Sequence, residues 1–220
     1  MTSTATLLVI AKAPVPGRVK TRLTPPFTPA EAARLAEAAL RDTLDAALAA
    51  PVRRRLLVLE GAPGPWLPAG FDVVRQRGDG LDERLAAAFE DAAADGPALL
   101  VGMDTPQLAA LPGLLAPALA PDAWQECDAW FGPAEDGGFW ALGLAAPDPA
   151  LLRGVPMSTP FTGAAQRARL TEAGLRVRDL PRVLDVDTAR DAERVAALAP
   201  GGRFAAEHRR LTPAVRGGAA

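Results

Sequence analysis

Residues 6–23 read TLLVIAKAPVPGRVKTRL, an apolar run followed directly by a basic loop. The run Thr6–Ile10 has the length and composition of a buried β-strand. In an open α/β sheet the ligand crevice lies outside the carboxyl ends of the strands, so a basic loop at this place would bind a phosphate or diphosphate. The alternative is a solvated surface loop. The cations of the loop are Lys12, Arg18, Lys20 and Arg22.

Three features of this loop favour the phosphate site. Gly17 permits a backbone conformation or a close approach that a side chain would block. Pro14 and Pro16 reduce the entropy that is lost when the loop orders around a ligand. Most of the cations lie next to the end of the strand and not at a distant tip. We therefore predict a nucleotide-phosphate loop that includes Gly17.

Length and charge limit the class of protein. A chain of 220 residues suits one α/β domain with a substantial core. Its formal net charge of −2 does not point to nucleic acid or to an anionic membrane surface. No apolar stretch approaches the ~20 residues of a membrane span, and Lys12 interrupts the first apolar run before it could act as a signal peptide. We expect a cytoplasmic protein with small-molecule partners.

The rare residues exclude other chemistries. Cys127 is the only cysteine, so the chain forms no internal disulfide and no Cys-based zinc site, which fits a reducing cytoplasm. His208 is the only histidine, and it lies in a region rich in glycine, arginine and alanine. A Ser-His-Asp or Cys-His mechanism would then have no ordered base. Carboxylates and cations must do any chemistry.

Strand-like runs alternate with helical patterns along the chain. Thr28, Pro29 and Glu31 form a capping-box pattern at the start of the first helix. The alternation predicts one Rossmann-like domain over residues 1–200: a doubly wound, mostly parallel α/β sheet with a small hairpin-like insertion in its second half. A weakly ordered tail is expected over residues 201–220. Strands are expected at 6–10, 55–59, 72–75, 98–101, 129–131, 139–144, 175–177 and 184–187, and further helices after 80, after Thr105-Pro106, at 164–173 and after Thr188.

Two aspartates stand where predicted strands end. Asp104 follows the run ALLVG, and Asp187 lies in LDVDT before a capped helix. Each could simply be a helix cap. Together with a basic phosphate loop, they could instead hold a hard divalent cation, because Mg²⁺ or Mn²⁺ takes one or two protein carboxylates and fills its other positions with water and phosphate oxygens.

Two further stretches carry candidate ligand contacts. In PAEDGG, the structural interpretation is a tight turn in which Gly137 and Gly138 are chosen for backbone geometry. The functional interpretation is that these glycines let a ligand approach while Asp136 accepts hydrogen bonds from sugar hydroxyls or assists the metal. In GDGLDERL, a predicted helix start, Arg84 is a candidate nucleotide contact.

Four motifs together resemble a known family over about residues 5–199. They are AKAPVPGRVKTRL (11–23), VGMDTP (101–106), FGPAEDGGFWALGL (131–144) and LDVDTARD (184–191). They look like the bacterial glycosyltransferase-A-like family of the nucleotide-diphospho-sugar transferase superfamily. By resemblance, Asp104 stands at the metal-binding aspartate and Asp187 at the second metal ligand. Met103 and Phe139 depart from the small polar residue and the tyrosine that are common there, so neither position offers a hydroxyl.

The resemblance implies a transferase that uses Mg²⁺ or Mn²⁺, with Asp104, Asp136 and Lys20 as candidate catalytic residues. Glycosyl transfer from a nucleotide-diphospho-sugar to a small acceptor is the preferred activity. A nucleotidyltransferase would use the same groups on a nucleoside triphosphate and a phosphorylated small molecule, with release of pyrophosphate. A non-catalytic nucleotide-binding protein is the third hypothesis.

Overall fold

The computed structural model describes residues 3–212, which form a seven-stranded sheet between two layers of helices. The strand order is β3-β2-β1-β4-β6-β5-β7, and β6 is antiparallel to its neighbours β4 and β5. All other pairings are parallel. The strands are β1 (Ser3–Lys12), β2 (Val52–Glu60), β3 (Asp72–Arg75), β4 (Ala98–Gly102), β5 (Ala129–Pro133), β6 (Phe139–Leu144) and β7 (Val177–Asp179).

Successive side chains of a strand point to opposite faces of the sheet, so the strands contribute to two hydrophobic cores, one on each face. Leu7 and Val9 face one core, which α1 and α3 cover, and Leu8 faces the other, which α2 and α4 cover. The predicted doubly wound sheet is therefore confirmed. The helices are α1 (Pro29–Ala49), α2 (Leu81–Ala92), α3 (Ala116–Leu119), α4 (Thr162–Glu172), α5 (Ala189–Leu198) and α6 (Arg203–Leu211). Within the described residues, no helix is long and apolar enough to cross a membrane.

Capping signals in the sequence mark two helix starts correctly. Thr28 and Glu31 form a complete capping box at α1, and Thr188 and Asp191 form another at α5. Each box satisfies backbone N–H groups that would otherwise lack a partner at the helix start. The box at α5 also fixes the chain direction immediately after Asp187.

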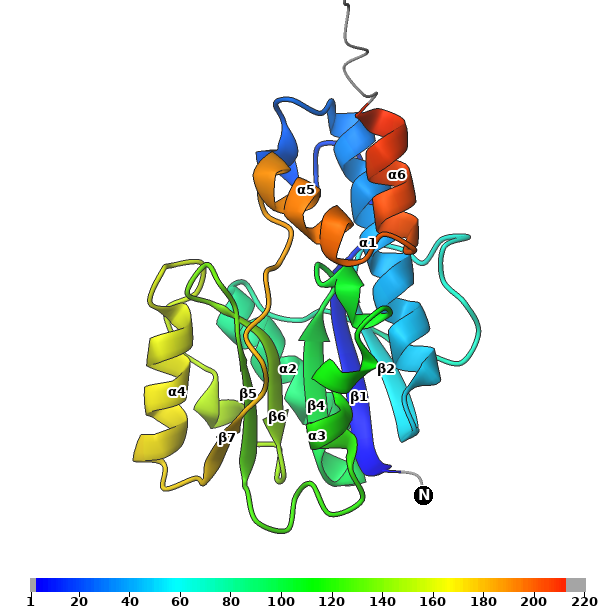
Figure 1. Ribbon diagram of the computed structural model, residues 1–220. Helices are drawn as coiled ribbons and strands as arrows, with labels where there is room; N and C mark the ends of the chain where they lie inside the picture. Colours follow the sequence, from blue (N-terminus) through cyan, green and yellow to red (C-terminus); the bar gives the residue numbers. More distant parts are fainter. Residues whose placement is uncertain (1–2, 213–220) are drawn as a thin grey trace, which may run out of the picture.

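A third apolar cluster lies beyond the carboxyl ends of the strands, where α5 and α6 pack beside the upper part of α1 (Figure 1). It contains Leu23 and Phe27 from the end of the basic loop and Val186 from the LDVDT stretch. Both chemistry-bearing segments are thus anchored in the same small core.

The prediction of a weakly ordered tail from residue 201 is wrong for residues 203–211, which form α6. The backbone N–H groups of Arg203 and Phe204 donate to the buried carboxylate of Asp42 on α1, at 3.0 and 2.9 Å. Gly202 precedes the helix because a Cβ there would lie 2.7 Å from Oδ2 of Asp42. Residues 213–220 lie outside the described part of the chain. His208 packs against Phe27 and Phe204 in the third cluster, on an ordered helix.

The expected hairpin-like insertion is formed by β5 and β6, and it is part of the sheet, with β6 between β4 and β5. Two other expectations need correction. Thr105-Pro106 opens two short 3-10 turns and the four-residue α3 instead of a long helix. Residues 184–187 form no strand, because no strand of the sheet pairs with them and their backbone contacts are single hydrogen bonds.

Candidate functional site

The LDVDT stretch crosses the carboxyl edge of the sheet from β5 to β4. Val183 forms a β-bridge with Ala134, and the backbone N–H of Glu135 donates to the carbonyl of Val183 at 3.0 Å. Further along, the N–H of Val186 donates to the carbonyl of Asp104 at 3.0 Å. This crossing brings Asp185 close enough to Asp104 for the two charges to interact. Asp187 follows two positions later, and its metal-binding role stays a prediction.

Lys20 lies at the centre of this arrangement. Its Nζ donates to Oδ2 of Asp104 at 2.8 Å and to the carbonyl of Val186. Its side chain is only 11 % exposed, and its backbone has the left-handed conformation, with φ 49°. Non-glycine residues adopt that conformation at a cost, which the surrounding structure must offset. Lys20 thus connects the basic loop, the end of β4 and the acidic stretch.

Arg22 joins the same group. Its Nη1 donates to Oδ2 of Asp187 at 2.6 Å. This hydrogen bond and the charge of Asp187 raise the pKa of Arg22, and Asp136 adds a smaller effect. Asp136 is therefore close enough for its charge to act on Arg22. Its role toward a sugar or a metal stays a prediction.

Asp185 was missed by the sequence prediction, which singled out only Asp187. Burial, together with the charges of Asp104 and Asp136, raises the pKa of the Asp185 carboxyl to about 7, while Lys20 opposes the shift. The signal was present in the motif, because residues i and i+2 of an extended segment point to the same side. We define Asp104, Asp136, Asp185 and Asp187 as the carboxylate cluster.

The remaining cations form a second group around Glu60, which the sequence reasoning also missed. Lys12 and Glu60 are register partners at the ends of β1 and β2, with Nζ and Oε2 3.3 Å apart. Arg84 of α2 donates to the same oxygen. Burial raises the pKa of Glu60, but the hydrogen bonds and charges of Lys12 and Arg84 outweigh that effect and lower it.

Two loop residues stay apart from both groups. Gly17 has φ +75°, so the conformational reason for glycine is confirmed. Arg18 is exposed on the outer part of the loop. Their proposed contacts with phosphate stay predictions.

The glycines of the PAEDGG turn have a structural reason of their own. A Cβ on Gly137 would lie 2.1 Å from the carbonyl oxygen of Pro160, and its φ is +91°. The N–H of Gly163, in the first turn of α4, donates to the carbonyl of Gly137 at 2.8 Å. Asp136 accepts a hydrogen bond from the N–H of Gly138 at 2.8 Å, as in a tight turn. Ligand contact by these glycines stays a prediction.

A groove of about 320 Å³ adjoins this turn. Its lining includes the backbones of Gly137 and Gly138, the apolar side chains of Phe131 and Pro160, and the guanidinium-bearing Arg182. Gly137 follows Asp136 directly in the chain, but no member of the carboxylate cluster is among the groove's lining residues.

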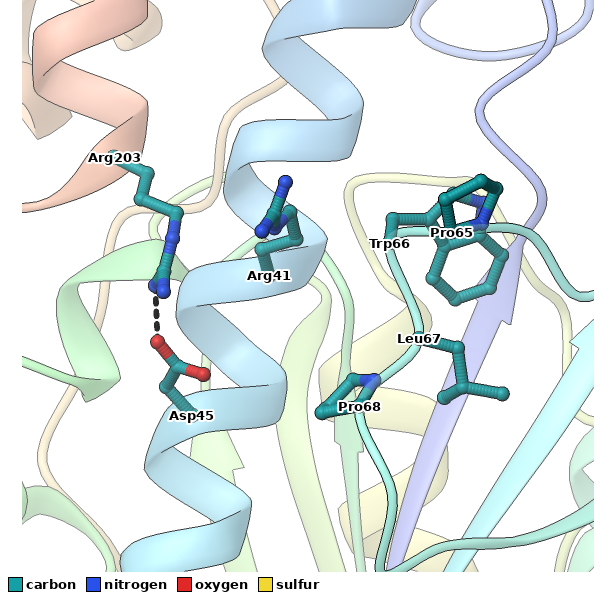
Figure 2. Close-up of a pocket in the computed structure, with 7 residues that line it drawn as sticks. All are labelled: Arg41, Asp45, Pro65, Trp66, Leu67, Pro68 and Arg203. Atoms are coloured by element: carbon teal, nitrogen blue, oxygen red, sulfur yellow. Dashed lines mark hydrogen bonds and ion pairs between the residues drawn. The ribbon is translucent and has the colours of Figure 1, made fainter.

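A second cavity, of about 130 Å³, lies between α1, residues 65–68 and the start of α6. Figure 2 shows Arg203 pointing toward Asp45, with which it forms an ion pair. None of the predicted site residues lines this cavity, and its charged groups are already paired, Arg203 with Asp45 and Arg41 with Glu37. We regard it as a gap between packed elements.

The donor chemistry at the strand ends fits Mg²⁺ or Mn²⁺. Within residues 3–212, no three Asp, Glu, His or Cys side chains form a ready-made metal-binding group. These ions need only one or two carboxylates when phosphate oxygens supply the remaining positions. With Asp185 ionised, the four carboxylates of the cluster exceed the two cations, Lys20 and Arg22, by two charges, and with Asp185 protonated they exceed them by one. Burial, followed by the charges of Asp104 and Asp136, raises the pKa of Asp185 and favours the protonated form.

Comparison with known proteins identifies relatives. Residues 33–159 match the family model described as "Uncharacterized protein conserved in bacteria (DUF2064)". No similar sequence was found among the curated proteins. Among solved structures, a candidate nucleotide-diphospho-sugar transferase from Desulfovibrio desulfuricans G20 has a TM-score of 0.81 at 24% identity, covering 94% of this chain and 95% of that one.

Two more distant structures share the fold. The CMP:2-keto-3-deoxy-manno-octonic acid synthetase complexed with CTP has a TM-score of 0.55 at 16% identity, covering 90% of this chain and 99% of that one. The 2-C-methyl-D-erythritol 4-phosphate cytidylyltransferase from Thermus thermophilus has a TM-score of 0.52 at 18% identity, covering 91% of this chain and 100% of that one. This chain therefore shares its fold with these three structures.

Proposed function

Since this chain belongs to the DUF2064 family, we propose that it is a Mg²⁺- or Mn²⁺-dependent glycosyltransferase that moves a sugar from a nucleoside diphosphate to a small hydroxyl acceptor. The observation that carries this proposal is the carboxylate cluster with Lys20 and Arg22 at the carboxyl edge of the sheet. The similar fold of the Desulfovibrio protein supports the superfamily and not the activity.

The donor's diphosphate would lie between the two groups of charges. Asp104 and Asp187 would hold the cation, which supplies positive charge to the leaving diphosphate. Lys12, Arg84 and Arg22 come from three different elements around that place and would contact the phosphate oxygens. Each such contact is a charge-assisted hydrogen bond, about twice as strong as a neutral one.

The acceptor would enter through the groove beside Asp136. In the transfer, the acceptor oxygen forms a bond to the anomeric carbon while the bond from that carbon to the diphosphate breaks, and the diphosphate leaves with the electron pair. The acceptor's proton would pass to the carboxylate of Asp136, which directly precedes the groove residue Gly137 in the chain. A neutral hydroxyl is favoured over a phosphate because the acidic cluster would repel an anionic nucleophile.

Nucleotidyl transfer is the second candidate, and the basic loop after β1 favours it. Related folds include two enzymes whose names indicate CTP chemistry, and a triphosphate would present more charge to Lys12 and Arg22. The chemical outcomes differ. A glycosyltransferase releases a nucleoside diphosphate, whereas a nucleotidyltransferase releases pyrophosphate.

The test is to identify the product. The protein with Mn²⁺ is incubated with a panel of nucleotide-sugars and, separately, of nucleoside triphosphates, and released nucleoside diphosphate and pyrophosphate are both measured. We expect slow, chelator-sensitive release of a nucleoside diphosphate from one nucleotide-sugar. Pyrophosphate from a triphosphate, with no response to any nucleotide-sugar, would establish the second candidate instead.

A further inference from the structure

Gln107 forms a hydrogen bond with the LDVDT stretch (residues 184–188). It lies in none of the motifs from which the site was predicted. It lies in the 3-10 turn Pro106–Leu108, three positions after Asp104. Its side chain is 1 % exposed, and its Nε2 donates to the backbone carbonyl of Leu184. In the described part of the chain, its Oε1 has no hydrogen-bond partner. A buried amide oxygen without a hydrogen-bond partner costs free energy, so the presence of glutamine at this position needs an explanation.

The reason lies in how residues 184–187 are held. They form no strand, so no ladder of backbone hydrogen bonds fixes their direction. Val186 has one backbone hydrogen bond to Asp104, and Lys20 donates to the carbonyl of Val186. Gln107 supplies the third contact, at the residue directly before Asp185.

We propose that Gln107 is a positioning residue that sets the direction of Asp185 and Asp187 over Asp104. It touches no substrate atom and acts only through the backbone of Leu184. The inference rests on the proposed function, in that the carboxylates so positioned bind the divalent cation and the diphosphate. Without the hydrogen bond from Gln107 to Leu184, the carboxylates of Asp185 and Asp187 would still be present, but they would not be oriented to bind the cation.

The chain offers a matched control in Gln166 of α4. Its side chain is also buried, its Nε2 donates to a loop carbonyl, that of Leu151, at 2.9 Å, and its Oε1 also has no partner within residues 3–212. Within residues 3–212, no hydrogen bond joins Gln166 or Leu151 to a member of the carboxylate cluster. A purely structural role of Gln107 would therefore make the two glutamines equivalent.

The experiment compares Gln107→Met and Gln166→Met with the parent, because methionine keeps the length of the side chain and removes the amide. Three quantities are measured: urea stability, amide hydrogen exchange of residues 184–187, and binding of Mn²⁺ with inorganic pyrophosphate by calorimetry. We expect similar decreases of stability in both variants. Only Gln107→Met should show faster exchange at residues 184–187 and an affinity ~10-fold or more below that of the parent, the scale known for groups that orient metal ligands.

The outcomes separate the two proposals. If the parent binds Mn²⁺–pyrophosphate and Gln107→Met binds it equally well with unchanged exchange, the positioning role is wrong. If the parent does not bind it but exchange rises only in Gln107→Met, the positioning role stands and the proposed function fails. Equal effects of both substitutions on exchange and binding would return Gln107 to a structural role.

Discussion

Asp104 combines two roles that a substitution can separate. Its carboxylate accepts a hydrogen bond from Lys20, and its carbonyl accepts one from Val186. Asp104→Asn keeps the shape, an oxygen acceptor and the backbone contact, but removes the charge that a cation needs. We expect an intact fold, by circular dichroism, with loss of Mn²⁺-dependent turnover and of Mn²⁺ binding. The matched change Asp122→Asn, at an exposed carboxylate, should do neither. Unchanged Mn²⁺ affinity in Asp104→Asn would contradict the metal assignment.

Asp185 links the site to pH. Its pKa is about 7 in the folded protein and about 4 in an unfolded chain. Because the folded pKa is the higher one, the folded state binds the proton more tightly, and stability falls as the pH rises from about 4 to about 7. Asp185→Asn removes this pH-dependent loss of stability, because the asparagine amide does not ionise. Measured by urea unfolding with chelator present, it should gain on the order of 2 kcal/mol relative to the parent between pH 5 and pH 8. Parallel stability profiles for the two proteins would show that the carboxyl is not perturbed.

At the scale of elements, α6 depends on one buried carboxylate. Asp42 is 2 % exposed and accepts two backbone N–H groups at the start of α6, whereas the neighbouring Asp45 pairs with Arg203 at the surface. Asp42→Ala leaves those N–H groups unpaired in a buried place, at a cost of about 2–3 kcal/mol. For a chain of this size the melting temperature should fall by roughly 4–12 °C. Asp45→Ala should change it little, since exposed ion pairs contribute about 0–1 kcal/mol. Equal effects would mean that α6 is held by apolar packing alone.

Elements that depend on local sequence signals were predicted correctly. The predictions that failed concern segments whose structure depends on residues far away in the sequence. The capping boxes at Thr28 and Thr188 operate within four residues, and both form. Helix α6 escaped prediction because the carboxylate that stabilises its start lies more than 160 positions earlier. Residues 184–187 have the apolar alternation of a strand, yet no neighbouring strand is left to pair with them.

The same distinction applies to the site. Lys20, Arg22, Asp104 and Asp187 could be predicted because each follows a strand or precedes a capped helix. Glu60 could not, because its partnership with Lys12 depends on the register between β1 and β2. Gln107 could not either, since its importance lies in a carbonyl 77 positions away.

At the scale of the whole molecule, the carboxyl edge of the sheet gathers cations from separate elements, and Lys12 and Arg22 are each paired there with a carboxylate. Replacing Lys12 and Arg22 together by alanine should weaken binding of Mn²⁺–pyrophosphate by about tenfold or more for each cation removed, because charge-assisted hydrogen bonds are worth about 1.5–3 kcal/mol. Arg53→Ala, at the opposite edge of the sheet near the start of β2, is the control. Calorimetry at moderate salt measures both. If the double variant and the parent bind Mn²⁺–pyrophosphate with equal affinity, the loop is a solvated surface loop and does not bind phosphate.

The stability of the folded chain reports which ligand class the crevice is built for. A ligand that binds only the folded state adds ~2.7 kcal/mol at 100 times its dissociation constant. For a domain of this size that corresponds to a rise of roughly 5–10 °C in melting temperature. With Mn²⁺ present, a nucleoside diphosphate or nucleotide-sugar should produce this shift, the bare nucleoside should not, and chelator should remove most of it. The comparison isolates the diphosphate and the cation, because the nucleoside shares the base and ribose contacts. A shift of equal size from the nucleoside alone, insensitive to chelator, would place the binding energy outside the carboxylate cluster and overturn the metal-dependent proposal.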